Sequence, residues 1–377
     1  MVPNLRFPSF SHDWKIYTFD DIASYKKGPF GSALKKDLFV PKSKESVKVY
    51  EQQNAINKDC HLERYFISAN YYEKMKSFTV YPGDTIVSCA GTIGELYTLP
   101  ENADIGIINQ ALMIIRNNQA IILKDFLNIQ FSRMIDEFSK TYSNGSAIKN
   151  IPPFSDLKRK KTYVPDKLEQ EKIIKFISLL DQKITTQIKI IDSYFSLSKA
   201  ISNTLIGQSK GNTRLRECLN CYSSNTMESV IKQEDLGDYP VYGANGIIKK
   251  INNYEIEYPS IAIVKDGSGV GKMFKLSGKY SILSTLNYLT SKPGYDIDYI
   301  YYALKQKSLK KYVVGSGIPH IYFKDYEQEK IYIPQNELQQ QNITSVLQSI
   351  DEEIGNEIKQ LKNYELLKKY LLKNMFV

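Results

Sequence analysis

The sequence is poor in the residues that metal and acid–base chemistry use most. Its histidines and cysteines are His12, His61, His320, Cys60, Cys89, Cys218 and Cys221. Three histidines leave little material for a catalytic apparatus, and four cysteines among 377 residues are too few for a disulfide scaffold. We therefore expect a reducing environment and no large active site.

Long apolar runs are also lacking. None approaches the roughly 18 residues that a membrane span needs, and the first 15 residues contain no apolar signal-peptide centre. A cytoplasmic protein without a membrane partner is expected. Hydrophobic residues still make up 42% of the chain, which is enough to build the cores of two or three domains.

The chain contains one pattern twice. A Tyr-Val-Pro or Tyr-Ile-Pro turn followed by a Leu-Glu-Gln or Leu-Gln-Gln run occurs at residues 163–173 and again at 332–343. An offset of 170 residues relates the two segments that follow, and an offset of 177 relates residues 82–94 to 259–271. The chain is therefore predicted to consist of two similar halves, each with a globular region followed by a long helix.

Each helical segment carries one narrow apolar stripe. Apolar residues recur every three or four positions, with Pro165 ahead of the first segment and Gly207 just past its end. Residues 168–206 would form a helix about 58 Å long. A narrow stripe needs a partner, and we expect the two helices to pair as an antiparallel coiled coil with pseudo-twofold symmetry. The predicted seam comprises Ile173, Ile177, Leu180, Ile184, Ile188, Ile191, Ile343, Leu347, Ile350, Ile354, Ile358 and Leu361.

The alternative is that each helix packs only on its own globular region. Those regions contain short strand candidates bounded by glycine turns, such as residues 85–88, 111–115 and 260–264, and helical stretches such as 124–140. The pattern predicts an α+β fold. The expected segments are a first globular domain at 1–162, a spacer helix at 163–206, a linker and second globular domain at 207–331, and a second spacer helix at 332–377.

Three apparent catalytic motifs are incomplete. Residues 267–272 resemble a phosphate-binding loop but lack its first glycine and its final Ser or Thr, so a turn between strands is expected. Residues 150–154 resemble the Asn-Pro-Pro-aromatic loop of amino-methyltransferases, but Ile151 stands where an amide or acid must orient the target amine. Cys218 and Cys221 form a lone CxxC pair, so packed thiols are expected rather than zinc. We predict no catalytic residue and no metal site.

The net charge of +9 favours a polyanionic partner without proving one. Residues 168–206 carry five basic and four acidic side chains and residues 338–377 carry five of each, so that +8 of the net charge lies in the globular regions. Lysines and backbone amides hold phosphates, while Asn, Gln, Ser and Lys can read base edges. The residues predicted to bind DNA are Lys26, Lys27, Ser32, Lys35, Lys36, Asn70, Tyr71, Tyr72, Thr92, Asn109, Gln110, Asn144, Ser146, Lys149, Tyr242, Asn245, Lys249, Lys265, Ser268, Lys272, Thr285, Ser316 and His320.

For any one of these residues a solvated surface loop is the alternative, so the prediction rests on the set and on its duplication. Further motifs occur in a fixed order along the chain. They are Leu5-Arg6-Phe7-Pro8 with Asp13-Trp14, the two Tyr-Val-Pro and Tyr-Ile-Pro helix entries, and Pro240-Val241-Tyr242-Gly243-Ala244-Asn245-Gly246 at the opening of the second half. In this order over the 377 residues, the motifs resemble the DNA-specificity subunits of type I restriction-modification enzymes.

That family implies two target recognition domains, each reading one half of a split DNA sequence and joined by a helical spacer. It implies double-stranded DNA, two modification (methyltransferase) subunits and restriction (translocase and endonuclease) subunits as partners, in the cytoplasm of a bacterium or archaeon. Adenine-N6 methylation and ATP-dependent cleavage would belong to those subunits, together with S-adenosylmethionine, ATP and Mg²⁺, and this chain would bind no cofactor. Because residues 28–31 do not copy the Tyr242 turn, the two domains are expected to read different half-sites.

Two other classes of protein remain open. A non-enzymatic coiled-coil adaptor that binds only proteins would explain the helices but not the duplicated basic loops. A DNA methyltransferase with built-in specificity domains, or a nuclease, would need an intact acceptor loop or a cluster of carboxylates, and the sequence shows neither.

Overall fold

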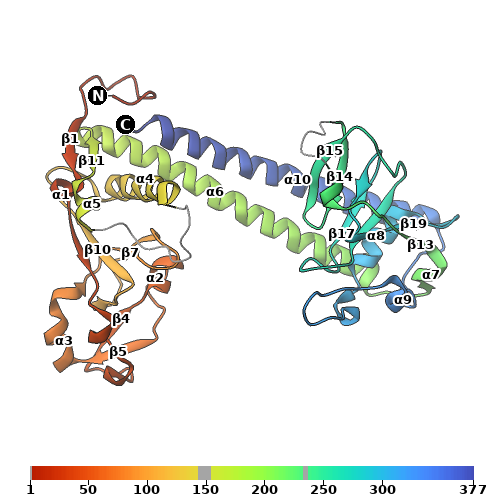
Figure 1. Ribbon diagram of the computed structural model, residues 1–377, viewed down its shortest axis with the longest axis horizontal. Helices are drawn as coiled ribbons and strands as arrows, with labels where there is room; N and C mark the ends of the chain where they lie inside the picture. Colours follow the sequence, from red (N-terminus) through yellow and green to blue (C-terminus); the bar gives the residue numbers. More distant parts are fainter. Residues whose placement is uncertain (1, 143–153, 232–236) are drawn as a thin grey trace. The chain divides into compact units, whose positions relative to one another are not determined.

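The computed structural model describes residues 2–142, 154–231 and 237–377 (Figure 1). The chain divides into two compact units, one formed by Met1–Thr185 with Asn363–Val377 and the other by Thr186–Lys362. Each long helix therefore contributes one part to each unit. In the described part of the chain, no helix is both long and apolar enough to cross a membrane.

The first unit combines short strands with short helices ahead of the long helix. Its strands are β1 (Lys15–Thr18), β2 (Ala23–Lys27), β3 (Phe39–Val40), β4 (Ser46–Tyr50), β5 (Tyr65–Ser68), β6 (Thr79–Val80), β7 (Thr85–Ser88), β8 (Leu96–Thr98), β9 (Gly106–Ile108), β10 (Leu112–Asn117) and β11 (Lys161–Val164). Its helices are α1 (Phe19–Ile22), α2 (Gln52–Ile56), α3 (Ala69–Met75), α4 (Lys124–Tyr142), α5 (Phe154–Arg159) and the start of α6 (Lys167–Ser202). The strands form the pair β1-β11 and sheets of order β2-β10-β7-β8 and β3-β5-β4-β9-β6.

The second unit begins within α6, at Thr186, and a π-helical turn at Asn203–Gly207 extends that helix. Its strands are β12 (Thr213–Arg214), β13 (Leu219–Ser223), β14 (Tyr239–Gly243), β15 (Gly246–Ile251), β16 (Ser260–Val264), β17 (Met273–Leu276), β18 (Ser281–Ile282), β19 (Leu286–Ser291) and β20 (Lys330–Ile331). Its helices are α7 (Leu215–Cys218), α8 (Ile297–Lys305), α9 (Phe323–Tyr326) and most of α10 (Glu337–Asn374). The strands form the pair β12-β20 and sheets of order β13-β19-β16-β17 and β15-β14-β18.

The two units repeat one topology. The sheets β2-β10-β7-β8 and β13-β19-β16-β17 are both antiparallel throughout and have the same strand order. In each unit a helix follows the second strand of that order, α4 after β10 and α8 after β19, and a two-stranded pair leads into the long helix. The α+β fold and its duplication are confirmed. The remaining sheet differs, with five strands in the first unit and three in the second.

The long helices are part of the hydrophobic cores. In the first unit Ile177 of α6 and Leu371 of α10 belong to one cluster with Trp14 and Phe126. In the second unit Leu347 of α10 joins a cluster that also contains Ile206, at the end of the π-helical turn. Thus each helix packs on a globular region and on the other helix, rather than on one of them alone.

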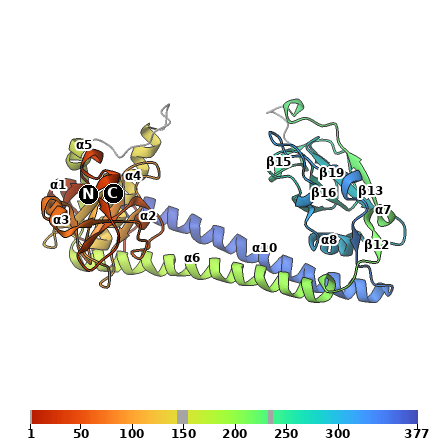
Figure 2. The same cartoon turned by 90° about the horizontal axis from the view of Figure 1, so that it is seen from below.

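Within each unit the two helices run antiparallel. In the first unit Lys368 Nζ lies 2.6 Å from Asp181 Oδ1, and Lys183 lies 5.8 Å from the ring centre of Tyr364, so residue numbers rise along α6 as they fall along α10 (Figures 1 and 2). In the second unit the Gln187 amide donates to Glu357, which is its equivalent in the repeat. Contact between equivalent positions is expected near the midpoint of two antiparallel copies of one helix.

Two of the predicted seam residues are not buried. Ile188 is 44% exposed and Ile358 is 46% exposed, so the seam prediction is wrong at these positions. They are equivalent to each other in the repeat, and both belong to the second unit. The other ten predicted residues are buried or half-buried. Ile188 and Ile358 were predicted to be buried from their spacing alone. Periodicity identifies an apolar stripe, but it does not show where a partner helix stops covering that stripe.

Both long helices begin in the same way. The side chain of Asp166 accepts a hydrogen bond from Glu169 N at 2.9 Å, and that of Asn336 accepts one from Leu338 N at 2.9 Å. These carboxylate and amide groups cap otherwise unpaired helix N–H groups. The Gln170 and Gln340 amides, both buried, donate to the carbonyls of Pro165 and Pro334 respectively. The repeated Gln in the sequence motif therefore fastens each helix to the turn before it.

The N-terminal segment is held on the first unit by a buried ion pair. Arg6 donates two hydrogen bonds of 2.7 Å to Glu169, whose side chain has no exposed surface, and Trp14 Nε1 donates a third at 3.2 Å. Leu5 N donates to Asn374 O at 2.8 Å, which brings the two chain ends together (Figure 2). The opening sequence motif therefore attaches the N-terminal segment to the first unit.

We predict that Arg6→Ala lowers the free energy of unfolding of the first unit by about 3 kcal/mol, because it leaves the Glu169 carboxylate buried without its cation. Urea denaturation measures the change. The control is Arg159→Ala, which removes an exposed pair with Asp156 and should cost less than about 0.5 kcal/mol. Equal effects of the two substitutions would show that the buried pair does not hold the segment.

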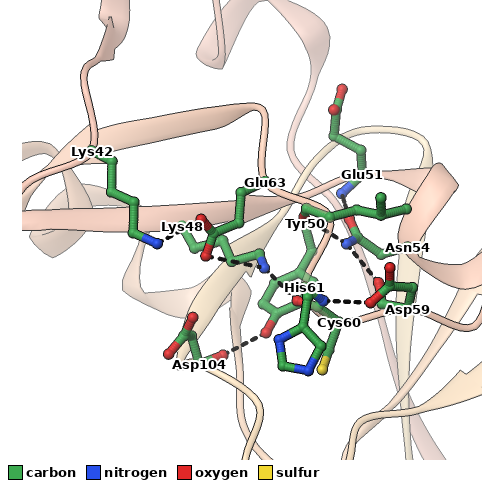
Figure 3. A network of polar contacts seen from close by, with 11 residues as sticks. Lys42, Lys48, Tyr50, Glu51, Asn54, Asp59, Cys60, His61, Glu63 and Asp104 are labelled. Carbon is green, nitrogen blue, oxygen red and sulfur yellow. Dashed lines mark hydrogen bonds and ion pairs between the residues drawn. The ribbon is translucent and has the colours of Figure 1, made fainter.

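A polar network closes residues 51–63 against the five-stranded sheet (Figure 3). The buried Lys48 amine donates to the Cys60 carbonyl and lies 3.8 Å from Glu63 Oε1, while Lys42 contacts the other carboxylate oxygen at 2.6 Å. The hydrogen bond from Lys42 holds the pKa of Glu63 below its ordinary value of 4.5, with a smaller contribution from Lys48. Burial lowers the pKa of Lys48. Burying the charged amine of Lys48 costs free energy, and its ion pair with Glu63 offsets that cost.

We predict that Glu63→Gln lowers the free energy of unfolding at pH 7 by about 2 kcal/mol, because Lys48 then stays buried without its ion-pair partner. Lys48→Met, which removes the buried charge and keeps the Lys42–Glu63 pair, should change it by less than about 1 kcal/mol. Urea denaturation at pH 7 and pH 3 tests both.

The stabilisation that Glu63 contributes depends on pH in a definite direction. Because the pKa of Glu63 is lower in the folded state, its stabilisation is present at neutral pH and is lost as the pH falls below about 4.5 through the folded pKa. The difference between the wild type and Glu63→Gln should therefore shrink at pH 3. A larger effect of Lys48→Met than of Glu63→Gln would contradict this description of the network.

Candidate nucleic-acid interface

In the first unit, three loops meet at one end of the four-stranded sheet. They are the loop after β2, the turn between β7 and β8, and the loop before β10. Gly28 N donates to Leu112 O at 2.9 Å, and Cys89 N donates to Ala111 O at 2.8 Å. Both donors lie just past the ends of their strands, so backbone hydrogen bonds fix the three loops beside one another.

Gly28 allows the closest of these approaches. A Cβ atom at this position would lie 1.8 Å from Asn109 O, a distance that no side chain tolerates. The glycine therefore lets the loop after β2 lie directly against the loop before β10. The Asn109 side chain accepts a hydrogen bond from Ala111 N at 3.0 Å and so stabilises its own turn.

The predicted DNA-binding residues of the first unit fall into two groups. Most lie on or beside these loops with exposed side chains, and these are Lys26, Lys27, Ser32, Lys35, Lys36, Thr92 and Gln110; Asn70 is also exposed but lies in α3. The others, Asn109, Tyr71 and Tyr72, are half-buried. Asn144, Ser146 and Lys149 lie outside the described residues, as do positions 150–153 of the apparent acceptor loop.

The two tyrosines of α3 stabilise the protein itself. The Tyr71 hydroxyl donates to Ala33 O at 2.7 Å, and the Tyr72 hydroxyl accepts from Thr79 Oγ1 at 3.1 Å. Lys26 Nζ lies 4.6 Å from the ring centre of Phe78, so its amine also lies against the protein. Tyr71 supports the loop that follows β2 from behind, because Ala33 belongs to that loop.

The second unit brings the corresponding loops together. Lys265 N donates to Thr285 O at 2.9 Å, which is the counterpart of the bond between Cys89 and Ala111, because each joins the end of β16 or β7 to the loop before β19 or β10. Ser284 N donates to Thr226 O at 2.7 Å and so attaches the loop after β13. The same three loops therefore meet at the same end of the same sheet.

Another loop, residues 314–322, joins this end of the second unit. Gly267 N donates to Pro319 O at 2.8 Å, and Ile321 N donates to Lys265 O at 2.9 Å. His320 pairs with Val314 through two backbone hydrogen bonds, and its Nδ1 lies 3.2 Å from Ile318 O. This arrangement brings Ser316 and His320 to the turn that carries Ser268.

The other predicted residues of the second unit are placed as follows. Asn245 is exposed in the β14–β15 turn and its side-chain oxygen lies 3.3 Å from Lys272 Nζ. Tyr242 is half-buried, with its ring 6.0 Å from that of Tyr280, and burial raises its pKa. Lys249 is a half-exposed residue of β15. Thr285 contributes its backbone carbonyl to the sheet end and is half-buried.

The apparent phosphate-binding loop at 267–272 is a turn between antiparallel strands, as predicted. β16 pairs with β17 on either side of it, and Gly267 and Gly271 have positive φ values of 93° and 82°. The thiols of the lone CxxC are packed, as predicted. Burial raises the pKa of Cys218 to about 12 and that of Cys221 to about 11. No group of three or more His, Cys, Asp or Glu residues able to hold a metal is found in the described ranges.

The sequence prediction included no exposed apolar residue at these sheet ends. Phe30 and Met227 lie in the loops after β2 and β13, and both have large exposed apolar side chains. The residues predicted to bind DNA all carry polar groups. The sequence feature that could have indicated Phe30 is its place in a glycine turn between two pairs of lysines.

The duplicated sheet end agrees with the comparison with known families. The model of the type I restriction modification DNA specificity domain matches residues 11–192 and 213–363. The chain belongs to this family. The two matches correspond to the two halves of the repeat, so the chain contains the specificity domain twice. Membership of a specificity family agrees with the prediction that the chain is not itself an enzyme.

Individual relatives support the assignment. The type I restriction enzyme MjaVIII specificity subunit of Methanocaldococcus jannaschii is 34% identical over 169 residues, which are 41% of this chain and 39% of that protein. The aligned part thus spans less than half of that relative.

Solved structures share the fold over the whole chain. The type I restriction-modification system S subunit from M. genitalium has 20% identity and a TM-score of 0.63, over 100% of this chain and 99% of that one. A chain from a study of complex assembly and conformational transition of the type I R-M system has 12% identity and a TM-score of 0.55, over 99% of each chain.

Proposed function

We propose that the chain is the DNA-recognition subunit of a type I restriction-modification enzyme and reads a bipartite sequence in double-stranded DNA. The observation that carries the proposal is the duplicated sheet end, where the same three loops, rich in lysine, amide and hydroxyl groups, are held together by backbone hydrogen bonds in both units. Each unit is one target recognition domain for one half-site. The loops differ in sequence, so the two half-sites differ.

The exposed loop residues are the direct contacts in this proposal. Lysines such as Lys35 and Lys36 hold phosphates, while Gln110, Asn245 and Ser268 read base edges. Tyr71, Asn109 and Thr285 act indirectly by shaping the loops, because their polar groups already bond to the protein, and Tyr72 bonds to Thr79 in β6.

The long helices form the spacer between the two half-sites. Helices of 36 and 38 residues are roughly 54 and 57 Å long at 1.5 Å per residue. Half-sites on one face of a duplex recur about every 34–36 Å, a separation that helices of this length can set. The spacer function rests on the antiparallel pairing that each unit shows for its part of the helices.

Two copies of a modification subunit are the proposed first partners. Exposed apolar residues recur at equivalent positions of α6 and α10, and the pairs are Leu168 and Leu338, Phe176 and Val346, Ile188 and Ile358, and Leu197 and Leu367. A duplicated apolar surface fits two copies of one partner. Restriction subunits would join this complex in the cytoplasm. S-adenosylmethionine, ATP and Mg²⁺ would bind to those other subunits.

We predict that binding of the full chain to random-sequence duplex DNA weakens steeply with salt, because lysines displace counterions from phosphates. The double substitution Lys35→Ala with Lys36→Ala should make the slope of log K against log salt shallower by about two. Fluorescence anisotropy from 50 to 200 mM salt, on the order of the range in which such slopes are large, measures it.

The matched control is Lys189→Ala with Lys199→Ala, which removes two exposed lysines from α6 and should leave the slope unchanged. A chain that binds DNA without any salt dependence, or not at all, would instead favour the protein-binding adaptor.

A further inference from the structure

An exposed apolar side chain stands in the same place in both units. Phe30 follows the edge strand β2 and Met227 follows the equivalent edge strand β13, and each immediately precedes a 3-10 turn, Gly31–Ala33 or Glu228–Val230. Phe30 is 88% exposed and Met227 is 58% exposed. A single exposed apolar residue needs no explanation, but its repetition at one topological position indicates that a partner covers it.

The loop that carries Phe30 is firmly held. Gly28 N donates to Leu112 O on one side, and Ala33 N donates to the carbonyl of Phe30 itself at 2.8 Å on the other. Pro29, between them, is buried and anchors the backbone. The aromatic ring is therefore presented to solvent by a backbone that is already ordered, so little entropy is lost when the ring binds.

Different hydrogen bonds order the loop that carries Met227. Thr226 O accepts from Ser284 N at 2.7 Å, and Ile231 N donates to Glu228 O at 3.2 Å. The hydroxyls of Ser224 and Thr226 both donate to the Glu255 carboxylate. Thus the repeat keeps the position and the exposure of the apolar residue, although the residues that fix the loop have changed.

The surroundings of Phe30 indicate a polyanionic partner. Two lysines precede it at positions 26 and 27 and two follow at 35 and 36, all of them exposed. A loop that carries lysines on both sides of an exposed ring in sequence suits a duplex better than an apolar protein pocket, because a duplex places stacked apolar bases directly between two rows of phosphates. Around Met227 the hydroxyls of Ser223, Ser224 and Thr226 bond to Asn287 and Glu255 and fix the loop. The indication from charge therefore applies to Phe30, while that for Met227 rests on its equivalent position and exposure.

We propose that Phe30 and Met227 are apolar wedges, one in each target recognition domain, and that each inserts into a base-pair step of its half-site. The inference rests on the proposed DNA-reading function. It goes beyond that function because part of the sequence recognition then comes from how readily one base-pair step of each half-site unstacks. Inserted Phe and Met side chains open and kink a duplex, and pyrimidine–purine steps open most easily. Each half-site should therefore contain such a step beside its directly read bases.

The test uses the purified full chain and a duplex selected by it from a random-sequence pool. In the wild-type complex, 2-aminopurine placed along the duplex should brighten at one step in each half-site. Phe30→Ala should abolish the signal in one half-site only, weaken binding to the selected duplex by about tenfold, and change binding to random duplex by less than about twofold. Phe30→Trp should restore the signal, and Met227→Ala should abolish the other one.

The matched control is Ile16→Ala, which shortens another exposed apolar side chain of the first unit, 57% exposed in β1, and should change neither signal. If the chain selects and binds a duplex but no 2-aminopurine position brightens, or if Phe30→Ala binds like Ile16→Ala, the wedge is overturned while DNA reading stands. If Phe30→Ala impairs only assembly with a modification subunit, the side chain is a protein contact and the wedge is likewise overturned. If no duplex is selected, the proposed function itself fails.

Discussion

The apolar stripe of each long helix is covered by different groups along its length. At the start of α6 the stripe is buried in the core of the first unit, where Ile177 shares a cluster with Trp14 and with Leu371 of α10. At the start of α10 the arrangement is repeated in the second unit, where Leu347 shares a cluster with Ile206. A helix fastened at its start to its own globular region and at its end to the other helix cannot slide without exposing apolar surface. The register of the two helices within each unit depends on this burial.

The four-stranded sheet is the fixed scaffold that positions the loops of each unit. Its strand order and the hydrogen bond between its two central strands at the loop-bearing end are repeated, whereas the loops themselves and the neighbouring sheet are not. In the proposed function such a scaffold can change the bases that it reads without changing its core, because loops tolerate substitution far better than buried strands do. The five-stranded sheet of the first unit and the three-stranded sheet of the second are consistent with two readers that have diverged in this way.

Much of this architecture was predictable because it is periodic. The helices, the 170-residue offset and the bounds of β7 and β16 follow from spacing and from turn residues. The five-stranded sheet was not predictable, because β3 and β6 have two residues each and are paired with strands far away in sequence. Composition also could not show that the hydroxyls of Tyr71 and Tyr72 bond internally. Exposure is a tertiary property, which is why Phe30 was missed.

The most direct test of the spacer is to shorten both helices together. Deleting residues 182–188 and the equivalent 352–358 removes one heptad from each helix, about 10 Å of rise. If the paired helices set the distance between the readers, the duplexes that the full chain selects will keep both half-sites and lose about three base pairs from the gap between them, at 3.4 Å per base pair. A changed half-site sequence, or a gap of unaltered length, would show that the helices do not act as a ruler.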